Sequence, residues 1–191
     1  MTDIEGVVRG FKVVLRGKRI EDAEDDYRWR TDPELALIDA TSPIRISLSE
    51  FERMLRDELR HPTSWVRRYG IDTLEGQHIG NCMLYDLDTV NGEAELGIMV
   101  GEREYWGRGY GREAMAYLVE ESFKISSMRR LRLHTLAWNA RARSAFSKVG
   151  FRELREVRRS NKDFIRMQIT REEWEAVRDE VLEPPLDAAG A

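Results

Sequence analysis

The sequence predicts an α/β fold: one mixed β-sheet with helices on its faces, in the order β-αα-βββ-α-β-α-ββ. Three observations predict it. Apolar residues change from helical spacing to strand alternation after about residue 63. Helix-start and hairpin signals then recur at short intervals. The 191 residues, 41% hydrophobic and 35% charged, suit one domain with a real core and a charged surface.

The first half of the chain predicts one strand, two helices and three more strands. The expected ranges are a strand at 11–15, helices at 20–31 and 47–60, and strands at 64–73, 77–86 and 93–100. Acidic residues crowd the start of the first helix, where the helix dipole favours them, and Asp32-Pro33 ends it. Ser47 and Glu50 have the spacing of a capping box. Asn91-Gly92 is a strong hairpin turn.

The second half predicts a loop, a helix, a strand, a short helix and a closing hairpin. The ranges are a loop at 102–109, a helix at 111–125, a strand at 131–137, a helix at 140–148, strands at 151–159 and 164–170, and a helical or frayed segment at 171–181. Gly150 suits the C-terminal cap of the short helix. We expect a single domain over residues 1–191, with its core at about 10–175 and an acidic, partly disordered tail at 176–191.

Composition excludes several classes of protein. The single cysteine, Cys82, rules out an internal disulfide and fits a reducing cytoplasm. No stretch approaches the roughly 18 apolar residues of a membrane span, so we expect a cytoplasmic location and no membrane partner. The three histidines lack metal-ligand spacing, so no metal site is expected. With a pI of about 5.6 and no zinc-finger or ribonucleoprotein motif, the sequence predicts no nucleic-acid partner.

The most informative stretch is a glycine-rich turn between a strand and a helix. Gly107, Gly109 and Gly111 let the backbone bend sharply and let a ligand approach the amides. Free N–H groups at a helix start form an anion site, and Arg108 and Arg112 add positive charge, so a pyrophosphate is the natural guest. The spacing matches neither the dinucleotide fingerprint nor the ATP-type loop. A plain glycine-rich connector is the alternative.

Charge is distributed unevenly along the chain. Residues 101–170 contain 16 basic and 8 acidic side chains, although the whole chain has a net charge of −4. An anionic ligand is most favourably bound in this basic block. A solvated basic face explains the same counts without any ligand.

Several stretches resemble known family motifs. The segment from Trp106 to Gly111 resembles the acyl-CoA pyrophosphate loop of the GNAT superfamily of N-acetyltransferases. The segments 94–100 and 105–114 together resemble its RimJ/RimL-like branch, 138–151 resembles its second motif and 163–174 its last strand. The likeness covers roughly residues 10–175.

The resemblance implies a GNAT-like fold with a splayed central strand pair and acetyl-CoA as co-substrate. The cleft is expected between the strand that ends at Val100 and the strand at 131–137. The implied binding residues are the main-chain groups of Ile98, Met99 and Val100 for the pantetheine arm, the amides of Trp106, Gly107, Arg108, Gly109, Tyr110, Gly111 and Arg112 for the pyrophosphate, and Asn139 and Phe146. For Asn139, a role as a simple helix N-cap is the alternative.

Transfer of an acetyl group to an amine needs a neutral amine, because an ammonium has no lone pair. Glu95 is the candidate base, acting through water. An exposed strand carboxylate or a cross-strand partner is the alternative role. Glu93 lies on the same strand face, so the two could instead form an acidic patch that recognises a cationic substrate. An oxyanion donor is expected from a main-chain N–H near Met99 or Val100.

Position 146 departs from the family pattern. The family commonly has a tyrosine there, whose hydroxyl protonates the leaving thiolate, whereas Phe146 has no proton to give.

The leading hypothesis from these motifs is an acetyl-CoA-dependent N-acetyltransferase that works by direct attack of the amine on the thioester. The acceptor is a peptide N-terminus, a polyamine or an amino sugar, and a homodimer is left open. The alternative is a non-catalytic acyl-CoA-binding or regulatory domain.

Overall fold

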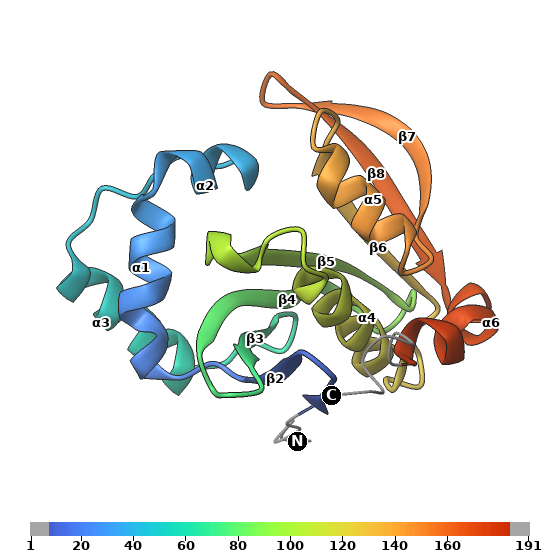
Figure 1. Ribbon diagram of the computed structural model, residues 1–191, viewed down its shortest axis with the longest axis horizontal. Helices are drawn as coiled ribbons and strands as arrows, with labels where there is room; N and C mark the ends of the chain where they lie inside the picture. The colour runs from blue at the N-terminus through green and yellow to red at the C-terminus, as the bar shows by residue number, and fades with distance from the viewer. Residues whose placement is uncertain (1–7, 184–191) are drawn as a thin grey trace.

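The computed structural model describes residues 8–183, which form one eight-stranded mixed sheet with helices against it (Figure 1). The strands lie in the order β1-β2-β3-β4-β5-β6-β8-β7. The strands are β1 Val8–Arg9, β2 Val13–Gly17, β3 Arg67–Thr73, β4 His78–Asp88, β5 Glu93–Val100, β6 Arg130–Leu136, β7 Arg152–Arg159 and β8 Lys162–Thr170. The helices are α1 Ala23–Thr31, α2 Pro33–Ile38, α3 Leu48–Arg60, α4 Tyr110–Phe123, α5 Ala140–Ser147 and α6 Arg171–Leu182, with 3-10 turns η1 Ile20–Asp22 and η2 Arg103–Tyr105. The predicted fold class is confirmed.

The main core lies between the sheet and the helices α4, α5 and α6. Half of the residues of helix α4, including Met115 and Val119, are buried, and Phe146 of α5 and Trp174 of α6 belong to the same cluster. The indole of Trp174 also donates to a carboxylate oxygen of Glu120 at 2.8 Å. This contact anchors α6, which is therefore a regular helix rather than the frayed segment that the sequence left open.

Helices α1, α2 and α3 form a separate layer with its own buried residues. Trp29 and Leu55 are buried there without belonging to the main cluster. A buried ion-pair network joins this layer to the sheet: Arg16 of β2 contacts both Asp22 before α1 and Asp72 of β3. The layer therefore sits against the sheet through charges as well as apolar contacts.

The sheet divides between β5 and β6. Their parallel pairing covers three residue pairs and ends at Glu95 opposite Arg132. Beyond that point β5 keeps its antiparallel partner β4 as far as Val100, while β6 keeps β8 as far as Leu136. In Figure 1, β4 and β5 extend to the left toward α1, whereas β7 and β8 lie at the upper right with the turn between them at the top. The two halves of the sheet leave a wedge between them, as the family resemblance predicts.

Most element ranges agree with the sequence prediction within a few residues. The strand at 93–100 and the Ser47–Glu50 capping box are both present. The two-residue strand β1 was not predicted, because two residues carry no alternation. The turn of the last hairpin is tighter than predicted: Ser160 and Asn161 both have positive φ, and β8 begins at Lys162. The tail predicted at 176–191 as acidic and partly disordered continues the helix α6 as far as Leu182, and its residues 184–191 lie outside the described residues.

Asp32-Pro33 ends one helix and also begins another. The Asp32 side chain accepts hydrogen bonds from the amides of Glu34 and Leu35, and Pro33 occupies the first helical position, so α2 starts directly after α1. The sequence predicted the end of α1 at this dipeptide but not the start of α2. Within residues 8–183, no helix has both the length and the apolar character that crossing a membrane requires.

Candidate active site

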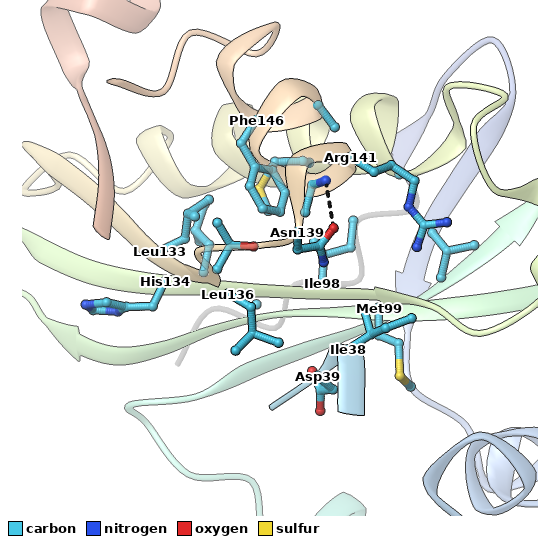
Figure 2. Close-up of a pocket in the computed structure, with 18 of the residues that line it drawn as sticks. Ile38, Asp39, Ile98, Met99, Leu133, His134, Leu136, Asn139, Arg141 and Phe146 are labelled. Carbon is cyan, nitrogen blue, oxygen red and sulfur yellow. Dashed lines mark hydrogen bonds between the residues drawn. The ribbon is translucent and has the colours of Figure 1, made fainter. Parts of the chain in front are cut away.

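A cleft of about 780 Å³ follows the wedge between β5 and β6. Its lining comes from these two strands, the turn before α4, helix α5 and the end of α2. In the view of Figure 2, Phe146, Asn139 and Arg141 lie on one side of the strand that carries Ile98 and Met99. Ile38 and Asp39 lie on the other side. The cleft therefore opens on both faces of the divided sheet.

The turn before α4 presents free backbone amides. Gly107 and Gly109 have φ values of 72° and 88°, a left-handed conformation that glycine adopts without strain. In the described part of the chain, no acceptor takes a hydrogen bond from the amides of residues 107–112. Trp106 differs from the prediction, because its amide already donates to the carbonyl of Arg103. The free amides and the helix dipole favour an anion at this point.

Cations surround the same turn. The guanidinium of Arg108 lies 5.9 Å from the Tyr105 ring and 6.0 Å from the Tyr110 ring, and Lys12 lies 5.7 Å from the Tyr110 ring. Arg141 stacks on the Trp106 ring at 4.0 Å and borders the cleft. These cations make the mouth of the cleft suitable for phosphate groups.

The register of β5 decides which main-chain groups face the wedge. The amide of Gly101 donates to the carbonyl of Ile79 in β4, and alternate residues of an antiparallel pair bond to the partner strand. Ile98 and Val100 therefore turn their main-chain groups toward the wedge. Met99 turns its groups toward β4 and contributes its side chain to the cleft, contrary to the main-chain role predicted for it. The Val100 carbonyl already accepts from the Trp106 indole at 2.7 Å.

Asn139 and Phe146 border the cleft from α5. The Asn139 side-chain oxygen accepts from the amide of Ala142 at 3.1 Å, the dashed line in Figure 2, so this residue is the N-cap of α5. The ring of Phe146 packs edge-on against Phe151 with centroids 6.3 Å apart. Tyr105, which also borders the cleft, donates its hydroxyl to Gln77 at 2.7 Å.

Glu95 lies at the point where β5 and β6 part. It is only 6% exposed and accepts hydrogen bonds from the Tyr85 hydroxyl at 2.6 Å and from Nδ1 of His134 at 2.8 Å. Burial opposes its ionisation, but these hydrogen bonds and the nearby Arg132 outweigh burial and lower the pKa of Glu95. Glu95 is therefore a buried, paired carboxylate rather than an exposed strand residue.

Two further acids differ in environment. Glu93 pairs with Arg130 at 3.1 Å and Arg132 at 2.8 Å, so its charge is neutralised within the sheet and adds little to any acidic patch. Asp39 follows α2 and borders the cleft near Ile38.

His134 was considered in the sequence only as a metal ligand. Strand alternation places it on the face of β6 opposite Leu133, and β6 runs beside β5 at Glu95. Glu95 and His134 are 39 residues apart in the chain. Only a prediction that β5 and β6 lie side by side would have brought these two residues together. In residues 8–183, no group of His, Cys, Asp and Glu is arranged to hold a metal ion.

The fold and the cleft together define a class of protein. The sheet is divided next to a helix start with free amides, so an anion site lies at one end of the cleft. Residues 12–152 match the acetyltransferase (GNAT) domain family. The match covers most of the chain, and the chain belongs to this family. It is an N-acetyltransferase, and acetyl-CoA is its co-substrate.

Known proteins of similar sequence or structure agree with this assignment. The chain is 28% identical over 123 residues to the uncharacterized N-acetyltransferase p20 of Bacillus licheniformis, covering 63% of this chain and 67% of that protein. It resembles in fold the Vibrio cholerae spermidine N-acetyltransferase in complex with CoA and spermine, with a TM-score of 0.75, 20% identity and coverage of 85% and 98%. It also resembles aminoglycoside acetyltransferase AAC(6')-Ib in complex with coenzyme A and kanamycin, with a TM-score of 0.72, 21% identity and coverage of 87% and 99%. The predicted superfamily is confirmed, and the RimJ/RimL-like branch stays a prediction.

Proposed function

We infer that this enzyme transfers the acetyl group of acetyl-CoA to a primary amine by direct attack of the amine on the thioester. The observation that supports this most is the continuity of the free amides at residues 107–112 with the wedge beside β5. One end of the cleft suits a diphosphate, and the other ends at the parting of the strands, beside ionisable side chains.

The chain offers a distinct group for each part of acetyl-CoA. The amides of Gly107 to Arg112 would hold the pyrophosphate, with Arg108 and Arg141 adding charge. The main-chain groups of Ile98 would hold the pantetheine arm, because they face the wedge next to its vertex. The same Ile98 N–H is the best-placed donor for the oxygen that becomes negatively charged during attack.

The acceptor enters from the face that carries α2 and Glu95. There the cleft has apolar side chains, Leu35 and Ile38, and the carboxylates of Asp39 and Glu95. This mixture suits an amine attached to a partly apolar molecule. The acceptor class is therefore a small primary amine, as in the polyamine and aminoglycoside acetyltransferases of similar fold, or a peptide N-terminus.

The pyrophosphate site is tested with Gly109→Asp. A carboxylate placed among the free amides repels the diphosphate, and the left-handed conformation strains the new residue. We expect the affinity for acetyl-CoA, measured by calorimetry, to fall by about 100-fold or more. Gly76→Asp is the matched control, since Gly76 also has a positive φ of 90° and open space around it, but lies outside the cleft lining.

Catalysis is tested by measuring free thiol and acetylated product over a panel of peptides, polyamines and amino sugars. We expect at least one amine to give equal amounts of thiol and product. Binding of acetyl-CoA without transfer to any amine would contradict the enzyme assignment and favour the acyl-CoA-binding alternative that Phe146 suggests. Equal binding by Gly109→Asp and Gly76→Asp would contradict the pyrophosphate site.

A further inference from the structure

The described residues place a histidine and a carboxylate in a geometry that neither the sequence nor the family match assigns. Nδ1 of His134 lies 2.8 Å from Oε1 of Glu95, and the hydroxyl of Tyr85 reaches the same oxygen at 2.6 Å. All three side chains border the cleft. The Glu95 and His134 side chains are 8% and 7% exposed, so the contact is almost fully shielded from water.

The contact determines which nitrogen of the ring holds the proton. An ionised carboxylate only accepts hydrogen bonds, and the pKa of Glu95 is lowered, so Nδ1 must be the donor. In a neutral ring Nε2 then carries the lone pair. Nε2 is buried and has no hydrogen-bond partner among residues 8–183. A buried polar atom without a partner is costly, and a bound substrate proton would satisfy it.

The position along the strands suits a role in the reaction. Glu95 and Arg132 form the last pair before β5 and β6 part, and His134 is the next residue of β6 on the same face as Arg132. The ring therefore lies beside the vertex of the wedge. In Figure 2 His134 lies at the left end of the cleft, away from Arg141 at the right.

We propose that Nε2 of His134 is the general base that removes a proton from the acceptor ammonium, and that Glu95 positions the ring and holds its tautomer. This inference rests on the proposed acetyl transfer. It changes the role of Glu95: its lowered pKa makes it a poor base, whereas it fixes the orientation and the tautomer of an imidazole well. Tyr85 shares the carboxylate and holds it in place.

The reaction transfers one proton of the ammonium to the ring and a second one to the leaving thiolate. Nε2 takes one proton from R–NH₃⁺, and the neutral nitrogen forms a bond to the thioester carbonyl carbon while the carbonyl oxygen takes up the negative charge. The C–S bond then breaks, and the second nitrogen proton leaves with the thiolate as free CoA thiol. The imidazolium returns its proton to solvent. The products are R–NH–acetyl, CoA thiol and one proton.

The groups around His134 are mostly cationic apart from Glu95. Arg132 lies on the same strand face, Arg166 is the cross-strand partner of His134 in β8, and Arg159 of β7 borders the cleft near Tyr85. Arginine charge does not change between pH 4 and 10. Any change in activity over that range that depends on His134 therefore reports the ring and its carboxylate.

The test compares His134→Gln with His61→Gln in the acetyl transfer assay. His61 is an exposed residue at the end of α3, so its change leaves activity intact. We expect His134→Gln to lower kcat by about 100-fold or more, the usual size of a base contribution, with acetyl-CoA affinity unchanged. The acidic limb of the wild-type pH profile should disappear. Glu95→Gln should lower kcat less than His134→Gln does, and it should change the shape of the acidic side of the pH profile.

Two further measurements separate chemistry from structure. His134→Gly leaves room for a free imidazole, and added imidazole should restore part of the lost activity in proportion to its unprotonated fraction. An alkoxyamine acceptor, already neutral at assay pH, should lose far less rate in His134→Gln than an alkylamine does. A loss of folding alone would produce neither result.

The outcomes distinguish this inference from the function on which it rests. If wild type acetylates amines and His134→Gln keeps full rate and the acidic limb, the base assignment is overturned and the acetyltransferase stands. If rate is lost equally for both amines and imidazole restores nothing, His134 is structural and the inference also fails. If wild type acetylates no amine, both proposals fall.

Discussion

Phe146 is the single residue at which this chain most clearly departs from its family. Its ring borders the cleft and is 9% exposed, packed edge-on against Phe151. A phenylalanine there can pack along a ligand but cannot protonate a thiolate. A CoA thiolate is a fair leaving group, so an enzyme without that acid transfers the acetyl group more slowly rather than not at all.

Phe146→Tyr should therefore raise kcat. We expect a gain of about 10-fold or less, below the usual size of acid catalysis because the thiolate leaves readily, with acetyl-CoA affinity nearly unchanged. Steady-state thiol release measures it. Phe151→Tyr is the matched control: its ring is 2% exposed and outside the cleft lining, so the added hydroxyl should destabilise the fold without raising kcat. An unchanged kcat in Phe146→Tyr would show that leaving-group protonation does not limit the rate.

Sequence patterns identify candidate site residues most readily where the chemistry is local in sequence. The glycine turn could be found because its amides, glycines and arginines lie within six residues of one another. Glu95 could be found because it belongs to the strand that leads into that turn. His134 could not be assigned its role, because its partner lies 39 residues away and the contact exists only once β5 and β6 pair.

At the scale of elements, α2 shows what sequence patterns miss. Six residues are too short to be helical without support. Besides the local cap, a distant part of the chain supports this helix: Arg103 of η2 bonds to Asp32 at 2.9 Å and to Glu34 at 2.7 Å. These partners are about 70 residues apart in the chain. The wedge itself was predicted through the resemblance, and its extent follows from which antiparallel partner each strand retains.

Arg103→Gln should loosen α2 and affect the acceptor more than the donor. Helix α2 positions Leu35 and Ile38 over the acceptor face of the cleft, whereas Arg103 makes no contact with the amides of residues 107–112. We expect KM for the amine to rise by about 2- to 5-fold, the modest effect of an exposed ion pair, with little change in KM for acetyl-CoA. Arg68→Gln, which removes an exposed pair with Glu58 at 3.4 Å, is the control. Equal shifts in both KM values would contradict a role confined to α2.

At the scale of the whole molecule, a buried charge network joins the layer of α1, α2 and α3 to the sheet. Arg16 bonds to Asp22 and Asp72, and His78 lies between Asp72 at 3.1 Å and Asp26 at 3.3 Å. Removing one member leaves unpaired charges in the interior, so Arg16→Met should cost about 3–5 kcal/mol of unfolding free energy. Arg158→Met, at an exposed pair 3.6 Å from Asp163, should cost less than about 1 kcal/mol. Urea titration measures both.

The same network predicts a pH window for stability. Burial alone would raise the pKa of Asp22, Asp26 and Asp72, but hydrogen bonds and cations outweigh it and lower all three. Their stabilisation is complete above about pH 4, the unfolded aspartate value, and is lost as pH falls through the lower folded values. Burial alone would lower the pKa of His78, but hydrogen bonds to Asp26 and Asp72 raise it. That contribution is complete below about pH 6.5, the unfolded histidine value, and is lost as pH rises through the folded value.

Because the aspartate pKa values are lowered and the His78 pKa is raised, the network stabilises the fold most between about pH 4 and pH 6.5. Unfolding free energies from urea titrations across the pH range should therefore decline on both sides of that window. In His78→Gln the alkaline decline should vanish while the acidic decline remains, because glutamine does not titrate and the three aspartates still do. The His61→Gln protein should keep both declines, since His61 is exposed at the end of α3. An alkaline decline that survives in His78→Gln would place its origin outside this network.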